Sequence, residues 1–331
     1  MQRDQKLKKA TVSQNTDRSE SPNAGLSFFE SGTSVVRFTS KKILRLSKKG
    51  RAGDPSGMLD AILTTDLPKD ANSGTYALLL NPKGRILTDL TVLKDGEDLL
   101  AVVETEGAEA ATETLRRYAP FSRVKIEETS LVVLGVFGPE AGSVLPVFPA
   151  ENASSRVEIG GCDTLVYGVS LPATGVGIIA EAQDSSGITE FLSHSGAEVM
   201  SEEHYETARI HRATPKFGAD ITQESFPAEA LLEERAVDFK KGCYPGQETV
   251  ARMHYRGQPN KFLHRFIVEG EARPGASILQ EDKAAGYLTS VAPLTVDGKI
   301  YALGYLKRRA DVAGELIAGD VKLEVSIPEA L

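Results

Sequence analysis

The chain alternates short apolar runs of strand length with a smaller number of stretches that have helical spacing. Runs such as 76–80 and 131–137 are compact and apolar, and each is followed by a turn that contains Pro and Gly. Helical spacing and good helix formers appear between such runs, for example at 108–118 and 204–211. When hairpins alternate with single helices, the helices gather on one side of an antiparallel sheet. The pattern therefore predicts an α+β fold.

The 331 residues are enough for two or three domains. Residues 1–25 are polar and mix acids with bases, which predicts a disordered tail. The rhythm of strands and helices predicts two α+β lobes over 26–256, the second of them at about 130–200. Short strands with frequent Gly and Pro follow in 257–331 and predict a small closed β-barrel.

Composition and charge narrow the classes of function. The formal net charge is -8, which argues against a broad nucleic-acid surface but leaves room for a local basic groove that holds a small anion. No apolar run reaches the about 18 residues of a membrane span, and no apolar N-terminal segment predicts a secretory signal. The two cysteines form no CxxC pair and no zinc-type cluster. We therefore expect no metal site, two free thiols and a reducing, cytoplasmic setting.

The segment from Lys241 to Arg252 carries the most chemistry and runs Lys-Gly-Cys-Tyr-Pro-Gly-Gln-Glu-Thr-Val-Ala-Arg. Its Gly and Pro residues predict a loop that leads into a short helix from about Gln247. Cys243 would then precede a helix N-terminus and lie beside Lys241, and both features stabilise a thiolate. Glu248 and Arg252 would share one helix face. On residue types alone, Cys243 is also consistent with a small buried hydrophobe.

This segment resembles the signature of the YgfZ family, Lys-Gly-Cys-(aromatic)-x-Gly-Gln-Glu-x-x-(Ala or Ser)-Arg, with every fixed position present. The related glycine-cleavage T-proteins have a similar Lys-and-Gly loop without the Cys and the Gln-Glu pair. The resemblance implies a T-protein-like ring of three domains, with antiparallel sheets and helices, a C-terminal barrel and a central hole that holds folate. It also implies a monomer that binds tetrahydrofolate or a related folate.

Three further segments extend the resemblance. Asn81–Leu90 is similar to the turn and strand that lead to a folate-site carboxylate, which implies Asp89 there, although T-proteins have two consecutive acids and this chain has Thr88 before Asp89. The stretch that begins at Arg209 places His211 where T-proteins have a pterin-binding Glu. The third segment, Phe226-Pro227-Ala228-Glu229, implies that Glu229 accepts hydrogen bonds from the pterin.

The resemblance thus implies one reactive thiol, Cys243, and a folate-binding set. This set comprises Asp89, His211, Glu229, Lys241, Gln247, Glu248 and Arg252. Structural interpretations stay open for three of them: a strand-edge surface carboxylate for Asp89, a boundary histidine on a helix for His211, and a helix N-terminal acid for Glu229.

The function implied by the resemblance is that of a folate-binding accessory protein. Such a protein supports iron–sulfur cluster assembly or repair, notably for tRNA-modifying enzymes, without binding nucleic acid directly. Because a four-iron cluster usually needs about four cysteines, any cluster contact by Cys243 would be shared with an iron–sulfur partner protein. Two alternatives stay open: an aminomethyltransferase-like one-carbon enzyme, and a cysteine hydrolase that pairs Cys243 with one of the five histidines.

Overall fold

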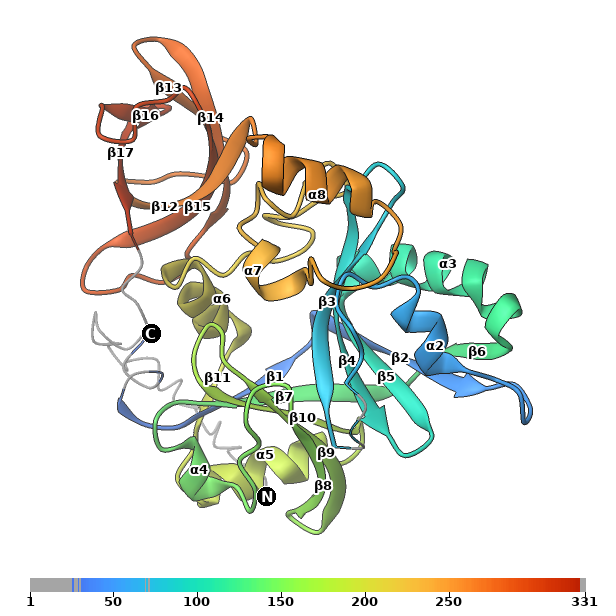
Figure 1. The fold of residues 1–331 in the computed structure, drawn as a ribbon. Helices are drawn as coiled ribbons and strands as arrows, with labels where there is room; N and C mark the ends of the chain where they lie inside the picture. Colours follow the sequence, from blue (N-terminus) through green and yellow to red (C-terminus); the bar gives the residue numbers. More distant parts are fainter. Residues whose placement is uncertain (1–25, 27–28, 30, 69, 71, 328–331) are drawn as a thin grey trace, which may run out of the picture.

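The computed structural model describes residues 26, 29, 31–68, 70 and 72–327. The tail predicted at 1–25 lies outside these residues. Within them the chain forms two β-sheets with flanking helices and a separate closed barrel (Figure 1). The α+β class and the C-terminal barrel predicted from the sequence are confirmed.

The first sheet has five antiparallel strands, because apolar and polar residues alternate along most of them and turns join them into hairpins. Helices α2 (Pro55–Asp60) and α3 (Thr105–Ser122) pack against one face of this sheet, over a core of Leu, Val and Ala. The strands are, in spatial order, β3 (Gly74–Leu80), β4 (Ile86–Asp95), β5 (Asp98–Glu104), β2 (Lys41–Lys48) and β6 (Val124–Glu128).

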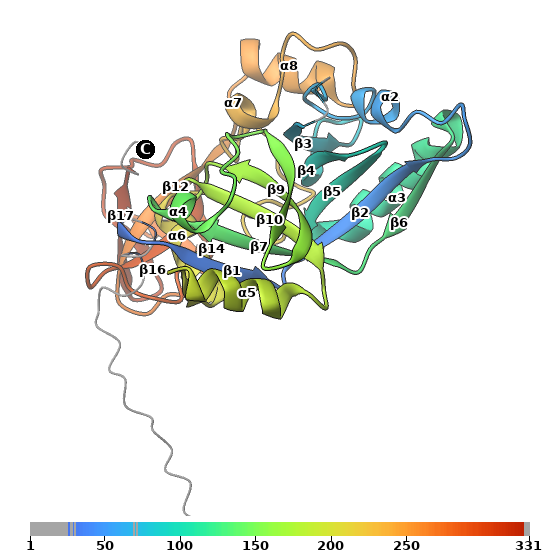
Figure 2. The same cartoon turned by 90° about the horizontal axis from the view of Figure 1, so that it is seen from below.

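The second sheet has six strands and is built mainly from the predicted second lobe. It also takes in β1 (Ser34–Phe38) from the start of the described chain, which pairs antiparallel with β7 and parallel with β11. Helices α4 (Ala141–Val144) and α5 (Ser185–His194) pack against this sheet and share a hydrophobic core with it (Figure 2). The other strands are β7 (Leu131–Phe137), β8 (Ser154–Ile159), β9 (Cys162–Val169), β10 (Gly175–Glu181) and β11 (Glu198–Met200).

The barrel has six strands in the closed order β12-β15-β14-β13-β16-β17. Its interior is filled by side chains such as Phe266, Leu288 and Leu306. The strands are β12 (Lys261–Glu269), β13 (Ser277–Gln280), β14 (Lys283–Val291), β15 (Ile300–Lys307), β16 (Leu316–Ala318) and β17 (Val321–Ser326).

Three short helices and the loops between them join the second sheet to the barrel: α6 (Glu202–His211), α7 (Glu233–Ala236) and α8 (Gln247–Arg256). A buried ion pair fixes this junction, since the Arg209 guanidinium lies 2.6 Å from a carboxylate oxygen of Asp220. Arg209 also donates to the Ser290 hydroxyl of β14 at 2.9 Å, and Ser290 donates to Asp220 at 2.8 Å. The barrel is therefore anchored to α6 by buried, hydrogen-bonded charges.

Candidate functional site

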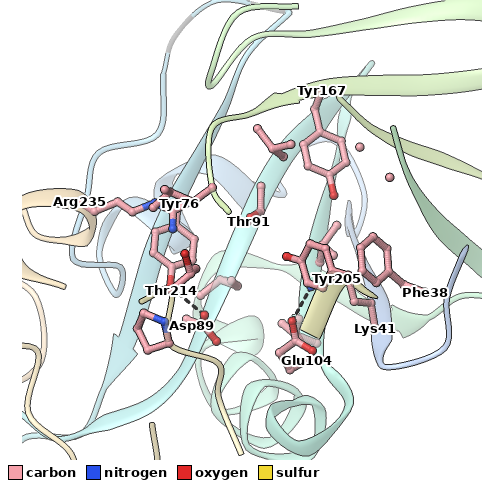
Figure 3. Close-up of a pocket in the computed structure, with 18 of the residues that line it drawn as sticks. Phe38, Lys41, Tyr76, Asp89, Thr91, Glu104, Tyr167, Tyr205, Thr214 and Arg235 are labelled. Carbon is pink, nitrogen blue, oxygen red and sulfur yellow. Dashed lines mark hydrogen bonds and ion pairs between the residues drawn. The ribbon is translucent and has the colours of Figure 1, made fainter. Parts of the chain in front are cut away.

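A cavity lies between the two sheets (Figure 3). Its wall takes residues from both sheets, from α6 and α7, and from the loop at 214–215. Its volume is about 120 Å³, several times the space that one water molecule needs. Sites for drug-sized ligands usually span roughly 300–1,000 Å³. The cavity therefore suits a head group rather than a whole elongated ligand.

Aromatic rings form much of this wall. Tyr205 packs edge-on against Phe38, with 4.7 Å between ring centroids, and lies 5.5 Å from the ring of Phe137. Tyr167 and Tyr76 complete the set. Burial raises the pKa of Tyr167 to about 12, so its hydroxyl stays neutral and can donate or accept a hydrogen bond. The wall thus offers flat apolar surface together with phenolic hydroxyls.

Two carboxylates reach the cavity from adjacent strands. Asp89 on β4 accepts a 2.8 Å hydrogen bond from the Tyr76 hydroxyl through Oδ2, and Glu104 at the end of β5 pairs with the Lys41 ammonium through Oε1 (Figure 3). The other oxygen of each acid, Asp89 Oδ1 and Glu104 Oε2, is buried and has no hydrogen-bond partner among the residues that the structure describes. Burial, together with the charge of Glu104, raises the pKa of Asp89.

Two further polar groups of the cavity wall are also unsatisfied within the described part of the chain. The Arg235 guanidinium stacks over the Tyr76 ring at 4.5 Å, and its Nε is buried without a partner. The Thr214 hydroxyl is likewise buried and unpartnered. Because buried polar groups are nearly always hydrogen-bonded, four such groups on one small wall indicate a binding site. The ligand should be flat, with donors for the two acids and at least one acceptor.

The carboxylate predicted at the folate site, Asp89, is the one member of the predicted set that lines this cavity. His211 ends α6 with its ring edge-on against Tyr301 of the barrel, at 4.6 Å between centroids. Glu229 is buried, and its carboxylate accepts the backbone N–H of Phe226 at 3.1 Å. Both residues lie outside the cavity wall and pack at the junction with the barrel.

Hydrogen bonds from the Lys241 side chain fix the loop at 241–246. The Lys241 ammonium is buried and donates to the carbonyls of Leu63 and Thr65, at 3.0 and 2.7 Å. Burial lowers the pKa of Lys241, against the opposing charges of nearby aspartates. The side chain of Gln247 then donates to the Lys241 carbonyl at 3.2 Å. Both residues hold the loop in place.

Cys243, in contrast, is exposed on this fixed loop. Glu248 and Arg252 on α8 are also exposed, and within the described chain they form no ion pair with each other. No histidine among the described residues hydrogen-bonds to the Cys243 sulfur, so the geometry gives no support to a Cys–His hydrolase. The thiol therefore belongs to an outer surface and does not line the cavity with Asp89.

The two sequence motifs meet at a backbone contact. Gly246 has φ +84°, and a Cβ placed on it would lie 2.5 Å from the carbonyl oxygen of Asn81 and 2.8 Å from Cα of Gly84. Only glycine fits at this position. Gly242, by contrast, has no described atom within 4 Å of an added Cβ, so of the two loop glycines it is Gly246 that makes a close approach.

Besides the aromatic residues of the wall, sequence reasoning missed four residues with charged or unsatisfied polar side chains: Lys41, Glu104, Thr214 and Arg235. Glu104 directly follows the apolar run at 99–103, which was the available signal, but its partner Lys41 lies on a different strand, far away in sequence. No local pattern marks such a pair.

Among the described residues, no group of three or more His, Cys, Asp or Glu side chains could hold a metal ion. The helices within the same residues are too short or too polar to cross a membrane.

The fold defines a class, that of proteins built like the glycine-cleavage T-protein. The structure is similar to glycine cleavage system aminomethyltransferase T from Bartonella henselae, with a TM-score of 0.77. The match covers 92% of this chain and 88% of that one, at 17% sequence identity. At this identity the likeness concerns the fold.

Residues 51–241 match the family described as the GCVT N-terminal domain. The chain is 30% identical to tRNA-modifying protein YgfZ of Yersinia enterocolitica over 55% of this chain and 56% of that protein. It is 30% identical to the protein of the same name from Vibrio atlanticus, over 65% and 64% of the two chains. The chain thus spans between half and two thirds of these curated relatives. It belongs to the GCVT N-terminal domain family, as a T-protein-like member of the YgfZ type.

Proposed function

We propose that the chain is a folate-binding accessory protein of tRNA modification and binds the pterin head of tetrahydrofolate in the cavity. The observation that carries this proposal is the pair of buried, unpartnered acceptors, Asp89 Oδ1 and Glu104 Oε2, within an aromatic wall. A pterin presents amino and ring N–H donors that suit two such acceptors, and its flat face suits the aromatic rings. The names of the YgfZ relatives support the link to tRNA modification.

The protein's own residues would hold and orient this head group. Glu104, whose Oε1 pairs with the Lys41 ammonium, would accept from the donor edge of the pterin through Oε2. Arg235 Nε and the Thr214 hydroxyl would serve its acceptor atoms. Tetrahydrofolate can carry a one-carbon unit on a pterin ring nitrogen, on the nitrogen of the linker beside the ring, or on both, and it has a glutamate tail. Since the cavity holds only a head group, the tail would extend away from the acids.

We further propose that Cys243 acts in iron–sulfur cluster assembly or repair, in the cytoplasm. Its exposure on a rigid loop leaves the sulfur open to a partner protein, as a shared or transient cluster ligand requires. The other described cysteine, Cys162, is only half-exposed and lies on β9 in the second sheet. One accessible thiol is too few to hold a cluster alone, so the cluster contact would be shared.

Calorimetric titration with tetrahydrofolate tests the binding proposal. The variant Glu104→Gln should bind at least about tenfold more weakly, because a charged hydrogen bond is lost. Glu229→Gln is the matched control, since Glu229 is also a buried acid but its carboxylate serves a local backbone turn. The opposite result, with loss only in Glu229→Gln, would place the pterin at the barrel junction instead.

Complementation tests the role of the thiol. In a deletion strain, Cys243→Ala should fail to restore an iron–sulfur-dependent tRNA modification, whereas Cys162→Ala should restore it. Full rescue by Cys243→Ala would end the proposal for this residue. The tetrahydrofolate affinity of Cys243→Ala should equal that of the wild type, because the sulfur lies outside the cavity wall.

A one-carbon transferase is the second candidate, and the position of Asp89 favours it. This acid lies in the cavity with a raised pKa, as a group that handles a proton there would. The residue before Asp89 is Thr88, which is fully buried near Gly107 of α3. Because threonine has no carboxyl group, the cavity has no second acid at this position. Formation of methylene-tetrahydrofolate from tetrahydrofolate and an aminomethyl donor would establish this activity.

A further inference from the structure

The outer surface of the barrel carries a hollow lined by cations. It lies between the β13–β14 hairpin and the turn that follows β15, and its volume is about 680 Å³. Lys283, Lys307, Arg308 and Arg309 line it, against a single carboxylate, Glu281. None of the four cations forms an ion pair with a carboxylate anywhere in the described part of the chain.

The backbone beneath these cations is rigid. The side chain of Gln280 donates to the carbonyl of Asp311 at 2.8 Å and accepts the Asp311 N–H at 2.9 Å, which ties the hairpin to the turn. The Lys307 ammonium donates to the Ala284 carbonyl at 2.7 Å. Small side chains at Ala284 and Ala285 leave the space between hairpin and turn open. The hollow is thus a formed feature of the barrel.

The same surface places like charges together at a cost in stability. Lys261 on β12 lies directly opposite Lys307 on β15 in the strand register. Like charges at such positions destabilise a sheet. In a chain with a net charge of -8, five unneutralised cations on one face of the barrel favour an anionic ligand that repays this cost.

An exposed aromatic ring borders the cations. Tyr287 on β14 is 38% exposed, and its hydroxyl accepts a 2.8 Å hydrogen bond from Lys261. The ring of Tyr287 packs against the buried ring of Tyr305, with 5.6 Å between the ring centroids. A supported ring beside a row of cations is the arrangement on which nucleic-acid bases stack while phosphates are neutralised.

We infer that this surface, the barrel basic face, binds a single-stranded segment of RNA. The barrel basic face consists of Lys261, Lys283, Tyr287, Lys307, Arg308 and Arg309. Guanidinium groups match phosphate oxygens in pairs, and the tyrosine ring accepts a base without sequence preference. The negative charge of the rest of the chain restricts RNA to this face, which agrees with the absence of a broad basic surface.

Fluorescence anisotropy with a labelled oligouridine RNA of about twelve nucleotides tests the inference. The logarithm of the binding constant should fall linearly with the logarithm of the salt concentration, with a slope of about -2 to -3 for three to four phosphate contacts. The double variant Lys283→Gln/Arg309→Gln should weaken binding about tenfold and make the slope shallower by about 1 to 2.

The matched control is Arg117→Gln/Lys125→Gln, which removes the same charge from exposed positions on α3 and β6. It should bind within about twofold of the wild type. Equal loss in both double variants, or no binding at low salt, overturns the inference. A polyglutamate peptide that competes as well as RNA would instead identify an acidic protein partner. Since all four residues are exposed, thermal unfolding should be unchanged in both variants.

Discussion

Asp89 is held in surroundings that disfavour its own charge. It is half-buried beside Glu104, its buried Oδ1 has no hydrogen-bond partner among the described residues, and the pKa of the carboxyl is raised. Such an arrangement costs stability in the free protein and is typical of a group kept for binding or catalysis. Glu229, by contrast, uses its carboxylate to accept the backbone N–H of Phe226, and Cys162 is half-exposed. Asp89 therefore supports the proposal that the cavity is the folate-binding site.

The variant Asp89→Asn should be more stable than the wild type near pH 7, by about 1 kcal/mol. Because the folded pKa is raised, the stability linked to this group is complete below its unfolded pKa of about 3.9 and is lost as the pH rises through the folded pKa. Asn does not titrate, so its advantage should shrink toward pH 4. Urea unfolding at several pH values measures this. A variant that is less stable at every pH would contradict the argument.

His211 gives the opposite pH dependence. Burial, and then the charges of Arg265 and Arg212, lower its pKa to about 4. The stability linked to it is therefore complete above its unfolded pKa of about 6.5 and is lost as the pH falls toward 4. The variant His211→Gln should lose less stability over this range, by about 1 kcal/mol after allowance for solvent screening of a half-exposed ring.

Tetrahydrofolate titration separates the two interpretations of His211. Because its ring packs on Tyr301, outside the cavity wall, His211→Gln should keep wild-type affinity. A loss of about tenfold or more would return His211 to the folate-binding set.

The loop at 241–246 and the turn at 81–84 act as one structural element through the Gly246 contact. The variant Gly246→Ala should lose at least about 2 kcal/mol, since it adds a strained φ and a contact of 2.5 Å with the Asn81 carbonyl. Urea unfolding measures the loss. Gly242→Ala is the control and should stay within about 0.5 kcal/mol, because its Cβ meets nothing within 4 Å.

A second control isolates the contact from the strain. Gly96 has φ +63°, and an added Cβ would meet no described atom within 4 Å. The loss of stability in Gly96→Ala should therefore come from backbone strain alone. If Gly246→Ala costs no more than Gly96→Ala, the two motifs are not held together by this approach.

Local patterns were enough to predict individual elements, but not how they pair. The run at Leu131–Phe137 was predicted to have strand length, and it forms β7 with the same bounds, beside the short run Ser34–Phe38 that forms β1. Their pairing as β1 and β7 was not predictable, because nothing in either run identifies a partner so far along the chain. Helix α5 ends at His194, since Gly196 takes φ +110° and Glu198–Met200 form β11.

The candidate site divides in the same way. Motif resemblance located Asp89, which a local turn and strand carry into the cavity. It also assigned Lys241 to the site, whereas the Lys241 ammonium donates hydrogen bonds to the carbonyls of Leu63 and Thr65. Glu104 was missed because its role depends on Lys41 and on the second sheet closing over it. A site assembled from several units becomes visible only in the folded chain.

The whole molecule places the cavity at the seam of its two sheets, so a bound ligand should bind the sheets together. Tyr76 and Asp89 come from the first sheet, whereas Phe38 and Tyr167 come from the second. Tetrahydrofolate at about 100 times its dissociation constant should stabilise the folded chain by about 2.7 kcal/mol. Amide hydrogen exchange should slow in β4 and β9 alike. The Glu104→Gln variant should need correspondingly more ligand for the same effect. Protection confined to one sheet, or equal stabilisation of Glu104→Gln, would show that the ligand binds elsewhere than at this seam.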